Sequence, residues 1–276
     1  MDSNQYWQNR LQQIAHSIYN KQEKKNQRLL QEYKGVYENI QSQLDELYRK
    51  YGDNNTLSST EMYKLNRLNN LQANIKRQVK SLGENEETFL GKSLYDNTKA
   101  VIINTTQYIN KTTELDWSYV DNKFIESAIK QNWEGGNFSD RVWDNKDKLI
   151  KNLNDTIVSG IASGTSINNM AANLKETMGS GAYDALRLVR TETMHTLNNA
   201  QTESFKKAGY SKVVWIAAED ERTCEICGEL DGQKFDIDDA PDCPAHPNCR
   251  CTLAADPNSL DMNDSSNENN EDGGEE

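Results

Sequence analysis

The side chains best suited to chemistry in this 276-residue chain are its five cysteines, which all lie in the stretch that ends at Cys251. Two residues separate Cys224 from Cys227, and His246 and Cys249 supply a second pair of donors further along. Two thiolates at that spacing grip a tetrahedral ion from one side, and a distant His and Cys complete it. A histidine donor and the lack of a cluster-type spacing favour zinc over an iron–sulfur cluster. The pattern predicts a zinc site of Cys224, Cys227, His246 and Cys249, with Cys251 as the alternative to Cys249.

Four protein ligands leave no open coordination position, so the predicted zinc is structural. Roughly ten kcal/mol or more of metal-binding energy would stabilise a unit too small to fold by apolar burial alone. Cys243, which stands between Asp242 and Pro244, is the least suitable ligand. Two other interpretations of the cluster stay open: redox chemistry, and cysteines without a ligand role that are free or joined in disulfides.

A second set of polar side chains lies along a predicted long helix before the cysteines: Arg190, Thr191, Glu192 and His195. An Arg, a Glu and a His together would suit a nuclease or transferase, which is the enzymatic alternative. No Ser-His-Asp order, phosphate loop or paired carboxylates accompany them. A deaminase-type catalytic zinc needs a Glu beside its His ligand, whereas Pro247 and Asn248 follow His246. We therefore predict no catalytic residues, and a structural polar cluster of Arg190, Thr191 and Glu192 that packs on the zinc unit through ion pairs.

A third class of function is a zinc-containing DNA-binding module. Such a module needs basic residues between its ligand pairs, but that segment is acidic, with Glu225, Glu229, Asp231, Asp236, Asp238 and Asp239. The formal net charge of −12 also argues against phosphate-driven DNA wrapping as the main activity. A local DNA contact stays compatible with the sequence, and its best candidates lie on the first helix: Lys21, Lys24, Lys25 and Arg28.

The elements that must position these side chains are mostly helices. Hydrophobic residues make up 35% of the chain and the mean hydropathy is −0.90, which suits two-sided helices better than a thick globular core. Apolar spacing predicts a helical hairpin that breaks at Gly52 and ends at Gly83. A second block, from about 86 to 157, includes helices starting at Asp116 and Ser139. A short helix after 166 and a long one over about 183–208, ended by Gly209, complete the helical part.

Beyond Gly209 the residue types change to those of strands. Residues 212–217 predict one strand, 233–235 one arm of a hairpin after the Asp231-Gly232 turn, and 251–253 a last short strand. From Asp256 the chain has eight acidic residues and no Lys or Arg, so we predict disorder there. The predicted fold is α+β and mostly α: an elongated helical body at 1–157, a zinc-stabilised β unit within 158–255, and a disordered acidic tail at 256–276.

No stretch approaches the ~18 consecutive apolar residues of a membrane span. The N-terminus, MDSNQYWQNR, lacks the basic-then-apolar layout of a signal peptide. We therefore expect no membrane partner and a cytoplasmic location during synthesis, where thiols stay reduced.

Several motifs occur in a fixed order: LVRTET at 188–193, Trp215, DERTCEIC at 220–227, LDG at 230–232 and HPNCRC at 246–251. In this order they resemble the Mu F-type head morphogenesis family of tailed phages, whose members are also called minor head or portal-associated proteins. The resemblance covers about residues 159–253, and HPNCRC is its most specific part. The first 150 residues are similar only as a helical region.

The resemblance implies a minor capsid protein of the virion, located in the head interior or at the portal vertex after assembly in the host cytoplasm. It implies roles in head assembly, DNA packaging or DNA delivery during genome ejection. The implied partners are the portal protein, the scaffold or major capsid protein, and viral DNA. Some relatives carry fused toxin or transferase domains, but this sequence continues into an acidic tail instead, so we expect no enzymatic activity.

Overall fold

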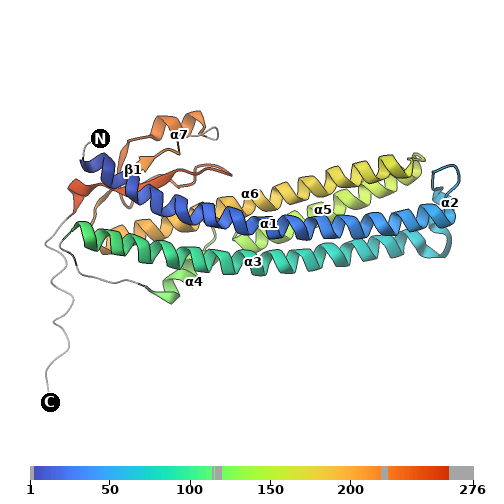
Figure 1. Cartoon of the computed structure of the whole chain (residues 1–276), viewed down its shortest axis with the longest axis horizontal. Coiled ribbons are helices and arrows are strands. Elements are labelled where there is room, and N and C mark those ends of the chain that lie inside the picture. The colour runs from blue at the N-terminus through green and yellow to red at the C-terminus, as the bar shows by residue number, and fades with distance from the viewer. Residues whose placement is uncertain (1–2, 114, 116–119, 219–222, 261–276) are drawn as a thin grey trace, which may run out of the picture. The chain divides into compact units, whose positions relative to one another are not determined.

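The computed structural model describes residues 3–113, 115, 120–218 and 223–260. Helices dominate it (Figure 1): α1 (Ser3–Tyr51), α2 (Ser59–Tyr63), η1 (Lys64–Asn66), α3 (Arg67–Thr112), α4 (Asn122–Lys130), α5 (Phe138–Ala162), α6 (Ile167–Lys207) and α7 (Glu225–Leu230). The other elements are β1 (Lys212–Ile216), β2 (Lys234–Asp236), β3 (Thr252–Ala255) and η2 (Pro257–Ser259). The predicted class, mostly α with a small β unit, is confirmed. None of the described helices has the length and hydropathy needed to cross a membrane.

The chain forms two compact units. The β-sheet unit comprises Met1–Glu23, Lys92–Gln131 and Arg190–Glu276, and the helical unit comprises Lys24–Gly91 and Asn132–Val189. These units do not follow the division at residue 157 that the sequence predicts. The start of α1 belongs to the β-sheet unit because Leu11 is part of the same buried apolar cluster as Trp215 and Phe205. The predicted domain boundaries, which follow the family resemblance, stay a prediction.

The helical unit is built from segments of α1, α3, α5 and α6, with α2 beside the end of α1 (Figure 1). Apolar side chains at intervals of three or four residues are buried along these segments, including Ile40, Leu44, Leu71, Ile75 and Val79. Hydrogen bonds join the segments at their edges. Tyr48 donates to the carbonyl of Thr165 at 2.9 Å, and Asn74 donates to Gln43 at 2.6 Å.

Three polar side chains lie inside the helical unit and bond to one another, while Glu86 Oε1 has no hydrogen-bond partner. Lys146 Nζ lies 2.7 Å from Glu86 Oε2, the Tyr33 hydroxyl donates to the same oxygen at 2.8 Å, and Lys146 Nζ donates to the Tyr33 hydroxyl at 2.5 Å. All three are buried, with exposed fractions of 2% or less. Burial raises the pKa of Tyr33 and lowers the pKa of Lys146. A buried charge of this kind is tolerated only when paired and hydrogen-bonded, so the three groups depend on one another.

Gly83 does not end a helix, contrary to the prediction. α3 continues through it to Thr112 because the glycine lets α3 approach α5: a Cβ at Gly83 would lie 3.0 Å from both Lys146 Cγ and Trp143 Cζ3. The short helix predicted after residue 166 and the long helix predicted from about residue 183 are likewise one helix, α6, which runs through Gly181. A Cβ there would lie 2.9 Å from two carbon atoms of Leu149.

A Gly83→Ala variant is expected to lower the free energy of unfolding by about 1–3 kcal/mol, because the added methyl group overpacks the contact with α5. Gly35 is the matched control, since it also lies within a helix but a Cβ there meets nothing within 4 Å. Gly35→Ala should raise stability by about 0.5–1 kcal/mol through lower backbone entropy in the unfolded chain. Urea unfolding of both variants measures the difference, and equal effects would show that the close approach at Gly83 is unimportant.

Two predicted helix starts also change. Asn137, not Ser139, caps α5: its side chain accepts hydrogen bonds from the backbone N–H groups of Ser139 and Asp140, while the Asp140 carboxylate accepts from Asn137 N. This reciprocal pair satisfies N–H groups that the first turn leaves without partners. The predicted start at Asp116 lies outside the described residues, and the next helix, α4, is capped by Asp121.

The β-sheet unit holds a three-stranded antiparallel sheet in the order β2-β1-β3. Val213 pairs with Phe235 of β2 on one side and with Ala255 of β3 on the other. Val213 and Val214 of β1 are buried, Ile216 is partly buried, and Trp215 is fully buried. The strand predictions at 212–217 and 233–235 are confirmed within one residue, and the last strand is displaced to Thr252–Ala255.

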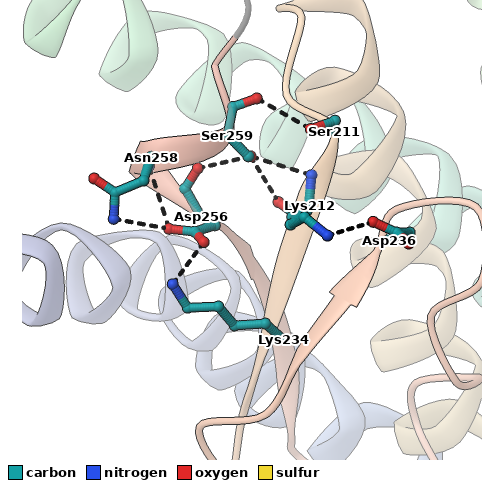
Figure 2. A network of polar contacts seen from close by, with 7 residues as sticks. All are labelled: Ser211, Lys212, Lys234, Asp236, Asp256, Asn258 and Ser259. Carbon is teal, nitrogen blue, oxygen red and sulfur yellow. Dashed lines mark hydrogen bonds and ion pairs between the residues drawn. The ribbon is translucent and has the colours of Figure 1, made fainter.

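The predicted disorder from Asp256 is wrong for its first five residues. Asp256 is 4% exposed, and Lys234 Nζ lies 2.7 Å from its carboxylate (Figure 2). Ser259 accepts a hydrogen bond from Ser211 N and, through its hydroxyl, from Lys212 N at 3.1 Å. These contacts attach the segment after β3 to the sheet as far as Leu260, which forms an isolated antiparallel β-bridge with Tyr210. Residues 261–276 lie outside the described part of the chain.

Candidate metal centre

The first two thiols are placed by the short helix α7. Cys224 caps this helix in an extended conformation, and its sulfur accepts a hydrogen bond from Cys227 N at 3.4 Å. Because Cys227 lies in the first turn of the helix, the two-residue spacing brings both sulfurs to one side. Cys227 is fully buried, whereas Cys224 is partly exposed.

The third and fourth donors are placed by a tight turn. Cys249 N donates to the carbonyl of His246 at 3.1 Å, with Pro247 and Asn248 at the two central positions. Asn248 has a φ of 65°, and this combination of Pro followed by a residue with positive φ is the pattern of a type II turn. Asn tolerates that conformation better than most residues. The HPNC sequence therefore brings a histidine and a cysteine to the same side of the chain.

The donors of the two segments meet at Cys227. Its sulfur lies 3.4 Å from His246 Nε2 and 3.7 Å from Cys249 Sγ. Two overlapping groups each have all donor atoms within 4.8 Å of one another: Cys224, Cys227 and His246, and Cys227, Cys249 and Cys251. A tetrahedral ion with Zn–S distances of ~2.3 Å separates its sulfurs by roughly 3.8 Å. The observed separations fit such an ion, so the cluster can hold a metal.

The thiols differ in how readily they ionise. A hydrogen bond with the Cys251 side chain lowers the pKa of Cys249, and the same interaction raises the pKa of Cys251. Metal ligation requires the thiolate. By position, both Cys249 and Cys251 belong to the donor group that contains Cys227, so either thiol can supply the remaining ligand. Cys243 is buried and its sulfur contacts the Cys251 carbonyl at 3.1 Å, outside both donor groups.

The comparison with known families bears on this same part of the chain. Residues 151–254 match the family model described as "Phage Mu protein F like protein". This region is similar to the phage Mu F-like family. The match indicates a likeness to phage head proteins over this region. The Mu F-like region contains α6, the sheet, α7 and all five cysteines.

One curated relative is named NAD(+)--arginine ADP-ribosyltransferase EFV, from Enterococcus faecalis (strain ATCC 700802 / V583). It is 26% identical over 156 residues, which cover 50% of this chain and 32% of that protein. The chain therefore spans about a third of that relative's length. No solved structure matches the chain.

The predicted polar cluster of α6, Arg190, Thr191 and Glu192, lies beside α1 and the HPNC turn. Arg190 forms an ion pair with Glu23 of α1, at 3.0 Å from Nε to Oε1 and 2.7 Å from Nη2 to Oε2. Thr191 does contact that segment, since its hydroxyl accepts from Asn248 N at 3.1 Å. Glu192 and His195 are 3% and 6% exposed, and His195 Nε2 lies 3.0 Å from Asn199 Nδ2. A polar cluster is present, but its ion pair ties α6 to α1.

Two polar side chains that the sequence did not single out also hold the loop that carries Cys249 and Cys251. Asn198 of α6 donates to the Cys251 carbonyl at 3.1 Å and accepts from Leu253 N at 3.0 Å, which aligns β3 along the helix. His16 of α1 lies 2.8 Å from the Arg250 carbonyl. The only sequence signal for Asn198 is a polar residue on the apolar face of α6, a pattern that does not identify its partner.

Proposed function

We propose that this chain is a phage minor head protein that binds the portal protein and acts in head assembly, DNA packaging or DNA delivery. In this proposal one structural zinc ion, held by Cys224, Cys227, His246 and Cys249, fixes the shape of the Mu F-like region. The scaffold or major capsid protein is a further candidate partner. The zinc would cross-link α7 to the HPNC turn and would take no part in a reaction.

The observation that supports the proposal most is the anchoring of the HPNC turn inside the matched region. Thr191 and Asn198, both on α6, hold the turn and the following strand through backbone hydrogen bonds. The donor atoms thus belong to a rigid frame rather than to a mobile active-site loop. A frame of this kind suits a docking module whose surface must keep its shape.

The arrangement of polar groups supports a non-enzymatic role. The Arg190 guanidinium is engaged by a carboxylate, and Glu192 and His195 are buried. A catalytic Arg, Glu and His must face a substrate, whereas these three face the interior or another helix. The transferase named above shares a third of its length with this chain, so its activity is not carried over.

Capture of the full-length tagged protein from cells that also express the portal protein of the same phage tests the proposal. We expect the portal protein to co-purify, and mass spectrometry of purified heads to detect this chain in far fewer copies than the major capsid protein. The major capsid protein, expressed in place of the portal protein, is the matched control. Absence from heads would overturn the head assignment, and capture of the capsid protein alone would overturn the portal assignment.

A further inference from the structure

The first part of α3 carries a run of positive charge in an otherwise acidic chain. Five basic residues and no acidic residue lie between Met62 and Gly83: Lys64, Arg67, Lys76, Arg77 and Lys80. Over the whole chain acidic residues exceed basic residues by twelve. Since all five side chains belong to the helical unit, their arrangement is defined within one compact body.

Four of the five basic residues, all but Lys64, line one or both of two adjoining hollows along α3. One hollow of about 410 Å³ is lined from both α1 and α3, and its floor includes Leu47, Tyr51 and Leu71. A second hollow, lined by Ala73, Lys76 and Lys80, shares Asn70 and Arg77 with the first, so the two are continuous along α3. We call this surface the α3 groove.

The charges of the α3 groove are only partly neutralised. At one end Arg67 pairs with Glu61 at 3.2 Å and stacks over the Tyr51 ring at 3.6 Å. Glu46, the acidic side chain that lines the groove, pairs with Lys50. At the other end, within the described part of the chain, no acidic side chain lies within 4.0 Å of the nitrogens of Lys76, Arg77 or Lys80, and all three are exposed.

We propose that the α3 groove binds the phosphate backbone of double-stranded DNA. Lys76, Arg77 and Lys80 supply three uncompensated cations within about 6 Å of helix length. Asn70 lies beside them, and amide side chains commonly add hydrogen bonds to phosphate oxygens. Such contacts position a duplex without reading its sequence. The site would therefore take DNA of any sequence, as a protein facing packaged DNA requires.

This location differs from the one that the sequence suggests. That earlier set on α1 is Lys21, Lys24, Lys25 and Arg28. Glu23 lies among these cations, and Arg28 Nε lies 3.5 Å from the carboxylate of Glu32, which follows them. The α3 groove has no such interruption between Met62 and Gly83. The choice of DNA among polyanions rests on the proposed head function, but DNA binding at the α3 groove does not require portal binding.

Fluorescence anisotropy with a labelled DNA duplex and the full-length protein tests this inference. Three phosphate contacts predict a salt slope of about −3, so affinity should fall about 40-fold between about 50 mM and about 200 mM salt. The variant Lys76→Gln/Arg77→Gln/Lys80→Gln should bind at least about tenfold more weakly at the lower salt concentration and lose most of the slope. Lys21→Gln/Lys24→Gln/Lys25→Gln removes the same charge from α1 and should keep both the affinity and the slope.

Thermal unfolding of both triple variants checks that these exposed substitutions leave the fold intact. Failure of the wild-type protein to bind DNA at low salt, or equal losses in the two variants, would overturn the inference. Portal capture separates it from the proposed function: the α3 variant should still capture the portal protein. If it loses portal capture and keeps DNA binding, the groove is a protein interface instead.

Discussion

A Cys227→Ser variant should lose its metal and fail to fold its β-sheet unit. Cys227 is the donor that both groups of ligands share, so its removal leaves neither group with three members. Roughly ten kcal/mol of metal-binding energy is available to folding, which is comparable with the whole stability of a typical domain. Elemental analysis should find one zinc per wild-type chain and less than about a tenth of that in the variant. The near-ultraviolet circular dichroism signal, to which the buried Trp215 contributes, should weaken in parallel.

Cys243→Ser is the matched control for this experiment. Cys243 is buried like Cys227 but belongs to neither donor group, so the substitution should keep the zinc. A comparison of Cys249→Ser with Cys251→Ser then distinguishes the two candidates for the fourth ligand, and the Cys249 variant should lose more zinc. If Cys227→Ser retains both the zinc and the wild-type unfolding midpoint, the structural-zinc proposal is wrong.

Lys146→Met should destabilise the helical unit by about 3–5 kcal/mol. The substitution fills a similar volume, but it leaves the Glu86 carboxylate buried without its cation. Urea unfolding followed by circular dichroism measures the loss, and the midpoint should fall without a change in the fold at zero urea. A surface lysine provides the control. Lys151→Met removes the exposed ion pair with Asp155 and should change the free energy of unfolding by about 0.5 kcal/mol or less.

A variant with all three polar groups replaced shows whether the loss comes from the unpaired charge. Lys146→Met/Glu86→Leu/Tyr33→Phe leaves no buried polar side chain unsatisfied at this place, so it should recover most of the lost stability. If the triple variant is no more stable than Lys146→Met, the cost comes from packing rather than from electrostatics.

Local chemistry is what the sequence predicts well. The periodicity of α1, the β-branched run of β1 and the turn residues Gly164 and Gly209, with φ of 67° and 90°, depend on near neighbours. The grouping of Cys227 with His246 was also predictable, since each donor pair sits in a turn or cap of its own. Such features need no knowledge of the remaining chain.

Contacts between distant segments are what the sequence predicts poorly. Gly83 has the type of a helix breaker, but the side chains of Lys146 and Trp143 packed against it explain why a glycine stands inside α3. The sequence contains several acidic residues that could pair with Arg190. Its pairing with Glu23 follows from the course of α1, which brings Glu23 beside α6. Asp256 has a disorder-promoting composition around it, and the ammonium group of Lys234 from another strand overrides that tendency.

The buried contact of Lys146, Glu86 and Tyr33 also bears on how the helical unit responds to force. Each member comes from a different helix: α5, α3 and α1. Apolar side chains that repeat along a helix would meet similar neighbours after a shift of one turn, about 5.4 Å. The ammonium, carboxylate and phenol would instead lose every partner at once. We therefore expect the three helices to resist sliding along their axes, so that the unit under tension holds its register until it unfolds.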